Sequence, residues 1–146
     1  MKVEVELDVS YEEPKIVIVT NRMTDEINEL VQKLSVSVPQ MIIAFQGGQA
    51  KILEHGDIIR VFSSAGKVYA ESVDGEYVLR PRLYELEERL DKGCFVRISN
   101  SEIINLKMVK QFDLSFSGTI CVSLLNGVTT YVSRRYVSKI KQVLGI

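Results

Sequence analysis

Glycine-containing turns divide residues 41–132 into short apolar segments, and this spacing is the feature that most restricts the fold of the chain. The segments between the turns are rich in Val, Ile, Tyr and Phe, residues that are enriched in β-strands. Glycine, with Asn or Asp before it, tolerates the positive φ angles of the tight turns that join antiparallel strands. The pattern predicts a mostly β fold, α+β overall, made of antiparallel hairpins. The turns are Gly47-Gly48, Ser63 to Gly66, Asp74-Gly75, Ser117-Gly118 and Asn126-Gly127.

Two short helices interrupt the β pattern, and both have apolar residues at helical spacing. "PRLYELEERL" begins with Pro81, and proline is favoured in the first turn of a helix. "SRRYVSKIKQVLG" has Ser133 as a predicted N-cap and Gly145 as a predicted stop. A third, amphipathic helix is predicted for "TDEINELVQKLS", where Thr24 is a suitable N-cap and acidic residues follow in the first turn.

The first 44 residues are predicted to form a small β-β-α segment ahead of a larger domain at residues 45–146. "KVEVELDV" alternates polar and apolar residues, which predicts a half-buried strand. "KIVIVT" predicts a second strand after Pro14, and the helix that begins near Thr24 follows it. Two strands and one helix cannot hold together alone. We therefore expect this segment to pack on the larger domain or on a second copy of the chain, as a dimerisation or regulatory element.

The sequence lacks the residue patterns of the common enzyme and metal sites. No G-x-S-x-G is present, and the position of the first P-loop glycine before Gly66-Lys67 holds Val61. His55 is the single histidine and precedes a glycine, so we expect a solvated turn residue. Cys94 and Cys121 lie far apart without a CxxC, which predicts reduced, partly buried thiols and no zinc site. We therefore predict no catalytic residue, metal, cofactor or small-molecule substrate.

The net charge of −1 combines an acidic and a basic part of the chain. Residues 1–90 contain ten Lys and Arg against sixteen Asp and Glu, a net charge of −6. Residues 91–146 contain eight against three, a net charge of +5. The C-terminal part is therefore suited to a polyanion, although uneven solvated faces are the simpler alternative. The N-terminus has no apolar signal-peptide core, and no segment has the roughly 18 apolar residues of a membrane span, which predicts a cytoplasmic protein.

Residues suited to nucleic-acid recognition are concentrated in this basic part. Asn and Arg have planar donor and acceptor groups that match base edges, whereas Lys, Ser and backbone amides hold phosphates. Each residue also has a simpler explanation: Arg97 could pair with a carboxylate, and Asn105 could cap a turn. The concentrated residues are Asn100, Ser101, Lys107, Arg134, Arg135, Lys139 and Lys141.

The order of strands, helices and motifs over about residues 45–145 resembles the LytTR family of bacterial DNA-binding domains. The central match is F-x-R-x-x-N-S-x-I-x-N, which follows a leucine-rich short helix, and the closing match is "SRRYV". The resemblance implies an antiparallel β-domain with short helices. It also implies that loops, not a recognition helix, enter successive major grooves and bend the DNA. The matched residues of the central motif are Phe95, Arg97, Asn100, Ser101, Ile103 and Asn105.

The resemblance also assigns roles to individual residues. It implies that Asn100 and Arg135 contact bases, with Arg134 beside Arg135 as a phosphate or alternate contact. Lys67 is the nearest equivalent of a third contact, in a loop that is shorter here than in the family, and it reads a base or only a phosphate. For Arg97 we favour bracing of the Asn100 loop or a phosphate contact over a base contact. The predicted DNA-binding residues are Lys67, Arg97, Asn100, Ser101, Lys107, Arg134, Arg135 and Lys139.

The predicted function is that of a sequence-specific transcription regulator on double-stranded promoter DNA. The short N-terminal segment resembles that of stand-alone LytTR regulators, because it is too short for a receiver domain. By this resemblance a membrane-bound inhibitor protein is a second expected partner. A homodimer is the simplest assembly, since direct-repeat sites need two domains. The alternative function is a protein-interaction module that does not bind DNA.

Overall fold

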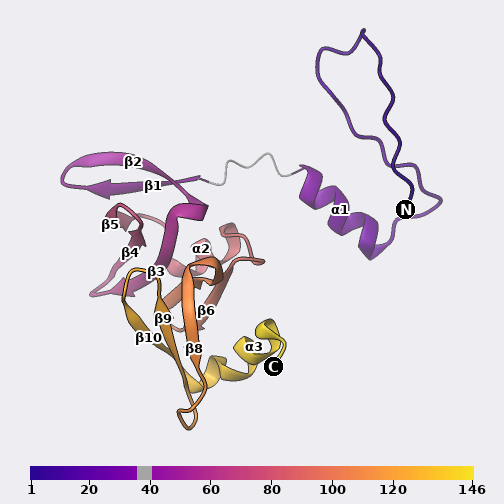
Figure 1. Ribbon diagram of the computed structural model, residues 1–146. Coiled ribbons are helices and arrows are strands. Elements are labelled where there is room, and N and C mark those ends of the chain that lie inside the picture. Colours follow the sequence, from indigo (N-terminus) through magenta and orange to yellow (C-terminus); the bar gives the residue numbers. More distant parts are fainter. Residues whose placement is uncertain (36–40) are drawn as a thin grey trace. The chain divides into compact units, whose positions relative to one another are not determined.

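The computed structural model describes residues 1–35 and 41–146 (Figure 1). The chain divides into two compact units, Met1–Val38 and Pro39–Ile146. The boundary expected after residue 44 lies inside strand β1 (Met41–Gln46). This strand pairs with β2 and β5 of the larger unit.

The smaller unit contains helix α1 (Asp25–Ser35), as its apolar spacing predicts. The Thr24 hydroxyl accepts a hydrogen bond from the backbone N–H of Ile27 at 3.2 Å, and the Thr24 carbonyl accepts one from Asn28 at 2.9 Å. This confirms Thr24 as the N-cap, since its side chain satisfies one of the donors that a helix start leaves free.

The prediction of two N-terminal strands, one on either side of Pro14, is wrong, because residues 1–24 form neither helix nor strand. The apolar side chains of the alternating segment are almost fully exposed, with Leu7 at 94% and Val9 at 106%. Alternation alone does not make a strand, because each strand needs a hydrogen-bonded neighbour and a surface to cover. This unit by itself offers neither.

The larger unit confirms the mostly antiparallel β fold. Seven strands form one sheet in the order β2-β1-β5-β4-β3-β7-β6, and three form a second in the order β10-β9-β8. All pairings are antiparallel. Beside β1, the first sheet contains β2 (Gln49–Glu54), β3 (Ile58–Ser64), β4 (Lys67–Ser72), β5 (Gly75–Leu79), β6 (Phe95–Ser99) and β7 (Glu102–Asn105). The second contains β8 (Val109–Asp113), β9 (Ile120–Leu124) and β10 (Thr129–Val132), and short 3-10 turns occupy His55–Asp57 (η1) and Leu106–Met108 (η2).

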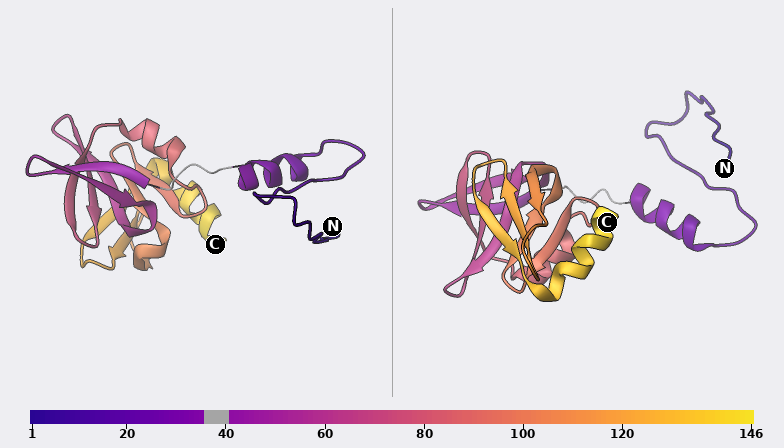
Figure 2. Two further views of the ribbon diagram at one scale, coloured as in Figure 1. Left: turned by 90° about the horizontal axis from the view of Figure 1, so that it is seen from above. Right: turned by 60° about the horizontal axis from the view of Figure 1, so that its bottom comes forward.

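Two hydrophobic clusters hold the larger unit together, one on each face of the seven-stranded sheet. The first contains Leu83 and Leu86 of α2 (Leu83–Arg89) and side chains from β1 to β7. The second joins β3, β6 and β7 to the three-stranded sheet and to Ile140 of α3 (Arg134–Leu144), which lies beside that sheet in Figure 2. Alternate residues of β6 serve the two clusters, because successive side chains of a strand point to opposite faces.

The turns follow the glycine pattern, although Ser63 and Ser64, which the sequence predicts as turn residues, still belong to β3. Gly47 and Gly48 have φ angles of 56° and 80°, as the tight β1–β2 turn requires. The β4–β5 hairpin forms, but its two turn residues are Val73 and Asp74, whereas Gly75 already pairs with Ser72. The Ser72 hydroxyl explains this shift, because it accepts from the Asp74 N–H at 3.1 Å and donates to the Gly75 carbonyl at 3.2 Å.

The two cysteines are placed as the sequence predicts, whereas the histidine is not. Cys94 and Cys121 are partly buried and unpaired, as expected. His55 is not solvated, because only 6% of it is exposed. Its ring meets the edge of Phe95, with ring centres 6.4 Å apart and planes at 82°. The η1 turn thus directs the imidazole into the protein, which nothing in the local sequence indicates.

Candidate nucleic-acid interface

Strand direction brings the turns with the predicted contact residues to one end of the larger unit. β3 and β6 end at this side, whereas β4 and β7 begin there. The Ser63 N–H donates to the Ser101 carbonyl at 2.9 Å, so the β3–β4 and β6–β7 turns are neighbours. β10 also ends at this side and leads through Ser133 into α3. We call this side the loop end; it consists of residues 63–67, 99–102 and 114–119 and the first turn of α3.

The β6–β7 turn presents Asn100 and Ser101 to solvent. Ile98 before the turn and Ile103 after it are buried, with exposures of 0% and 1%. The Ser101 N–H donates to the Ser99 hydroxyl at 3.2 Å, a hydrogen bond within the turn. Two polar residues therefore stand at an exposed tip that is anchored by apolar residues on both sides.

Arg97 braces this turn from below. Its Nε donates to the Ser99 carbonyl at 3.0 Å, and one terminal nitrogen donates to the Asn100 carbonyl at 2.5 Å. The other terminal nitrogen contacts a Glu87 carboxylate oxygen of α2 at 2.6 Å. Arg97 thus pairs with a carboxylate and also braces the turn, which are two of the roles that the sequence suggested. The side chain is only 16% exposed, so its guanidinium is committed to the protein.

The start of α3 is fixed beside the same turn. The Ser133 N–H donates to the Ile98 carbonyl at 2.9 Å, and the Tyr136 hydroxyl donates to the Asn100 side-chain oxygen at 3.3 Å. Arg135 is exposed between these two anchors, and exposed Lys139 follows four residues later on the same helix face. Arg135 therefore lies at the loop end near the Asn100 turn, and Lys139 follows it one helical turn further along α3.

Arg134 points to the β8–β9 loop. A Cβ at Gly118 would lie 3.2 Å from Arg134 Nε, so the guanidinium lies over the turn that this glycine makes at a φ of 73°. Ser133 takes the N-cap position of α3 as predicted, but its hydroxyl makes no capping hydrogen bond. Gly145 ends the helix in the left-handed conformation at a φ of 74°, as predicted.

Lys67 lines a shallow depression of about 380 Å³ between the β3–β4 turn and the start of α2. Arg82 and Arg97 line it too, together with Ser63 and Ser64. The sequence did not indicate Arg82, since a basic residue after Pro81 reads as an ordinary helix start. Arg82 therefore places one more cation beside Lys67 than the motifs predict.

Lys107 and Asn105 are placed differently from the other predicted residues. Lys107 is exposed in η2, beyond the end of β7 that is remote from Asn100, so the structure does not bring it to the loop end. Asn105 is 1% exposed; its amide donates to the Ile58 carbonyl at 2.9 Å and its oxygen accepts from the Lys107 N–H at 3.0 Å. The second asparagine of the motif therefore caps a turn.

The fold and this end together define a β-rich module that presents Asn, Arg and Lys on turns. Comparison with known families identifies it: the model of the LytTr DNA-binding domain matches residues 48–145. The chain therefore belongs to the LytTR family of DNA-binding domains.

Relatives of the whole chain have been named in Staphylococcus aureus. An uncharacterized HTH-type transcriptional regulator of strain NCTC 8325 / PS 47 is 29% identical and covers 100% of this chain and 99% of its own length. Its counterpart in strain MRSA252 is 28% identical with the same coverage. Among solved structures, the LytTr DNA-binding domain of a protein described as a methyl-accepting/DNA response regulator from Bacillus cereus matches with a TM-score of 0.71. It is 21% identical and covers 73% of this chain and 98% of its own. This match confirms the fold.

The name HTH-type does not describe the part of this chain that the structure shows. Strands separate α1 from α2 and α2 from α3. Residues 1–35 and 41–146 therefore contain no helix pair joined by a turn. None of these three helices is both long and apolar enough to cross a membrane.

Proposed function

We propose that this protein is a transcription regulator that reads specific sequences in double-stranded promoter DNA with its loop end. The β3–β4 turn, the β6–β7 turn and the start of α3 are the proposed reading elements, inserted into successive major grooves. The observation that carries the proposal is the gathering of Lys67, Asn100 and Arg135, from three separate parts of the sequence, at one exposed end.

Each exposed residue has a role suited to its chemistry. Asn100 and Arg135 are the proposed base readers, because their side chains match adenine and guanine edges. Ser101, Arg134 and Lys139 are proposed phosphate contacts, which fix orientation and register on the duplex. Lys67 contacts a base or a phosphate, and Arg97 acts from inside by shaping the turn that carries Asn100.

The N-terminal unit is the proposed dimerisation element. Three of its apolar residues, Val5, Leu7 and Ile16, are more than two thirds exposed within the chain. Pairing with a second copy would give the alternating segment the hydrogen-bonded neighbour that a strand requires. Sedimentation of the full chain tests this, with a homodimer expected and a monomer at micromolar concentration arguing against it.

Two further parts of the proposal rest on the family resemblance. A bacterial promoter is reached in the cytoplasm, so we propose that the protein acts there. A membrane-bound inhibitor protein is the proposed restraining partner. Co-purification of the chain from membranes with a single small membrane protein is the result that supports this partner.

Selection from random DNA tests the proposed activity directly. The full chain is incubated with random duplexes of roughly 30 base pairs, about three helical turns, and bound DNA is amplified over several rounds. One enriched sequence is expected, and fluorescence anisotropy with that duplex should show affinity that falls steeply with salt, because phosphate neutralisation releases counterions. No enrichment, together with no binding at low salt, would instead favour a protein-interaction module.

A further inference from the structure

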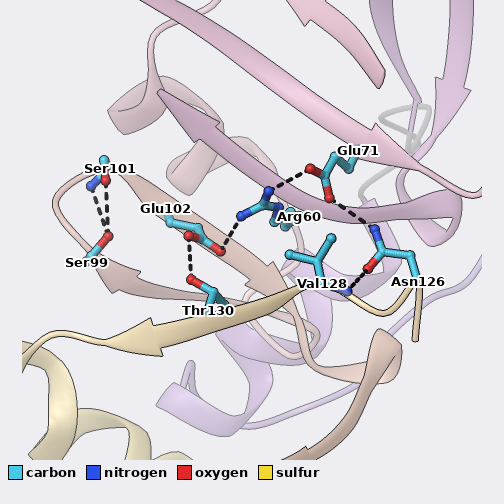
Figure 3. Close-up of polar contacts among 8 residues, drawn as sticks. All are labelled: Arg60, Glu71, Ser99, Ser101, Glu102, Asn126, Val128 and Thr130. Atoms are coloured by element: carbon cyan, nitrogen blue, oxygen red, sulfur yellow. Dashed lines mark hydrogen bonds and ion pairs between the residues drawn. The ribbon is translucent and has the colours of Figure 1, made fainter. Parts of the chain in front are cut away.

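A buried polar network crosses the larger unit behind the loop end (Figure 3). Arg60 of β3 lies between two carboxylates, with one terminal nitrogen 2.6 Å from Glu71 and the other 3.4 Å from Glu102. The three side chains are only 11–16% exposed. A buried charged pair is costly to desolvate and adds little stability compared with apolar packing. We therefore expect the network to have a role other than stabilising the fold.

The two carboxylates connect the seven-stranded sheet to the three-stranded sheet at different places. Glu102 accepts a hydrogen bond from the Thr130 hydroxyl of β10 at 2.8 Å. Glu71 accepts one from the Asn126 amide in the β9–β10 turn at 3.0 Å. In Figure 3, Ser99 and Ser101 lie at one end of the network and Asn126 at the other. The Glu102–Thr130 bond is therefore the link near the loop end.

Hydrogen bonding keeps Glu71 ionised despite its surroundings. Burial alone would raise the pKa of its carboxyl, but hydrogen bonds from Arg60 and Asn126 and the positive charge of Arg60 lower the pKa below its ordinary value. Burial likewise opposes the charge of Arg60, yet the two carboxylates raise its pKa. The Asn126 amide therefore donates to a charged oxygen of Glu71, and hydrogen bonds to charged groups are the stronger kind.

We propose that Glu102 is a positioning residue for DNA reading, which sets the distance between the Asn100 turn and the start of α3. This inference rests on the proposed function. Glu102 directly follows Ser101, and Thr130 lies two residues before the end of β10, which leads into Arg134 and Arg135. One carboxylate thus joins the two reading elements from behind, while Arg60 joins it to β3, which leads into the Lys67 turn.

Such a residue affects sequence reading more than affinity for DNA in general. A hydrogen bond to a base edge weakens steeply when its distance or angle changes. Attraction to phosphates depends mainly on the number of charges and is the same for all sequences. Loss of the link should therefore reduce binding to the selected duplex and leave binding to scrambled DNA nearly unchanged.

Two substitutions of Thr130 in the full chain separate positioning from stability. Thr130→Val keeps the shape but removes the hydroxyl, whereas Thr130→Ser keeps the hydroxyl and removes a methyl group. Anisotropy is measured with the duplex enriched from random DNA and with its scrambled version. We expect Thr130→Val to bind the enriched duplex about tenfold more weakly, the loss of one well-formed base contact, with scrambled DNA within about twofold. Thr130→Ser should keep the wild-type ratio, even where its thermal unfolding temperature is the lower of the two.

Asn126→Ala is the distal control, since it removes a link of the same network that is remote from the loop end. It should leave the ratio of the two affinities unchanged. Equal ratios for Thr130→Val and wild type, or an equal loss in Thr130→Ser or Asn126→Ala, would overturn the positioning role and leave only a contribution to stability. A wild-type chain that enriches no sequence would overturn the proposed function and this inference with it.

Discussion

Arg97 donates a hydrogen bond to the backbone carbonyl of Asn100, 2.5 Å away, and so holds the proposed base-reading residue by its main chain. The side chain of Asn100 remains exposed and has the Tyr136 hydroxyl as its partner at 3.3 Å. The flat, rigid guanidinium makes this possible, because it serves two carbonyls and the Glu87 carboxylate in one plane. Lysine has the charge but not this geometry.

Arg97→Lys should therefore impair DNA reading without removing a charge. We expect binding to the selected duplex to weaken by about 1–3 kcal/mol, as for loss of a charged hydrogen bond, with little change for scrambled DNA. Anisotropy with both duplexes measures this. Glu87→Gln should act in the same direction, and the double variant should lose less than the two single losses added, because both residues act on one brace. Strictly additive losses would argue for a direct contact of Arg97 with DNA.

Asn100→Ala and Arg135→Ala should each cost about 1–3 kcal/mol of binding free energy and relax the preference at one base position. Repeating the selection with each variant shows which position of the enriched sequence becomes variable. Lys107→Ala is the matched control, because this exposed cation lies away from the loop end. A loss in Lys107→Ala as large as in Arg135→Ala would show that the interface extends beyond the loop end.

Lys139→Ala should weaken binding to all sequences by the same factor. Its ammonium group is a point charge on an exposed helix face, suited to a phosphate. The slope of log affinity against log salt should become shallower by about 0.9, the value for one phosphate contact on duplex DNA. Anisotropy over a series of salt concentrations gives the slope. Relaxed specificity at a single base pair would instead assign Lys139 to base reading.

His55 should make the fold less stable in mild acid. Burial lowers the pKa of its imidazole below the ordinary value of 6.5, and the charge of Arg89 lowers it further, while Asp91 offsets only part of this. Below pH 6.5 the unfolded chain therefore binds a proton that the folded chain does not. The free energy of unfolding should be highest above pH 6.5 and fall toward the lower pKa of the folded state, by at most about 1.4 kcal/mol per pH unit.

Urea unfolding of the wild type and of His55→Leu between about pH 5 and 7 measures this slope. His55 is the only histidine, so the variant should lose most of the dependence in that range. A slope that is the same in both proteins would mean that other groups cause it.

The sequence by itself determined the local features of this protein. Gly47-Gly48 fixes a tight turn, Thr24 caps a helix, and alternation along β9 buries Ile120, Val122 and Leu124, because each depends on neighbours in the chain. The motif around Asn100 likewise indicated the family that the comparison confirms. Features that depend only on neighbouring residues can therefore be predicted from the sequence.

The tertiary structure alone decided which residues meet. Several features depend on residues from different elements. They are the ion pair of Arg97 with Glu87, the burial of His55, the place of Arg82 in the depression and the Glu102–Thr130 hydrogen bond. The same reason accounts for the two N-terminal strands that do not form. A strand becomes stable through a partner that the sequence does not name, whereas a turn or a helix cap is complete within a few residues.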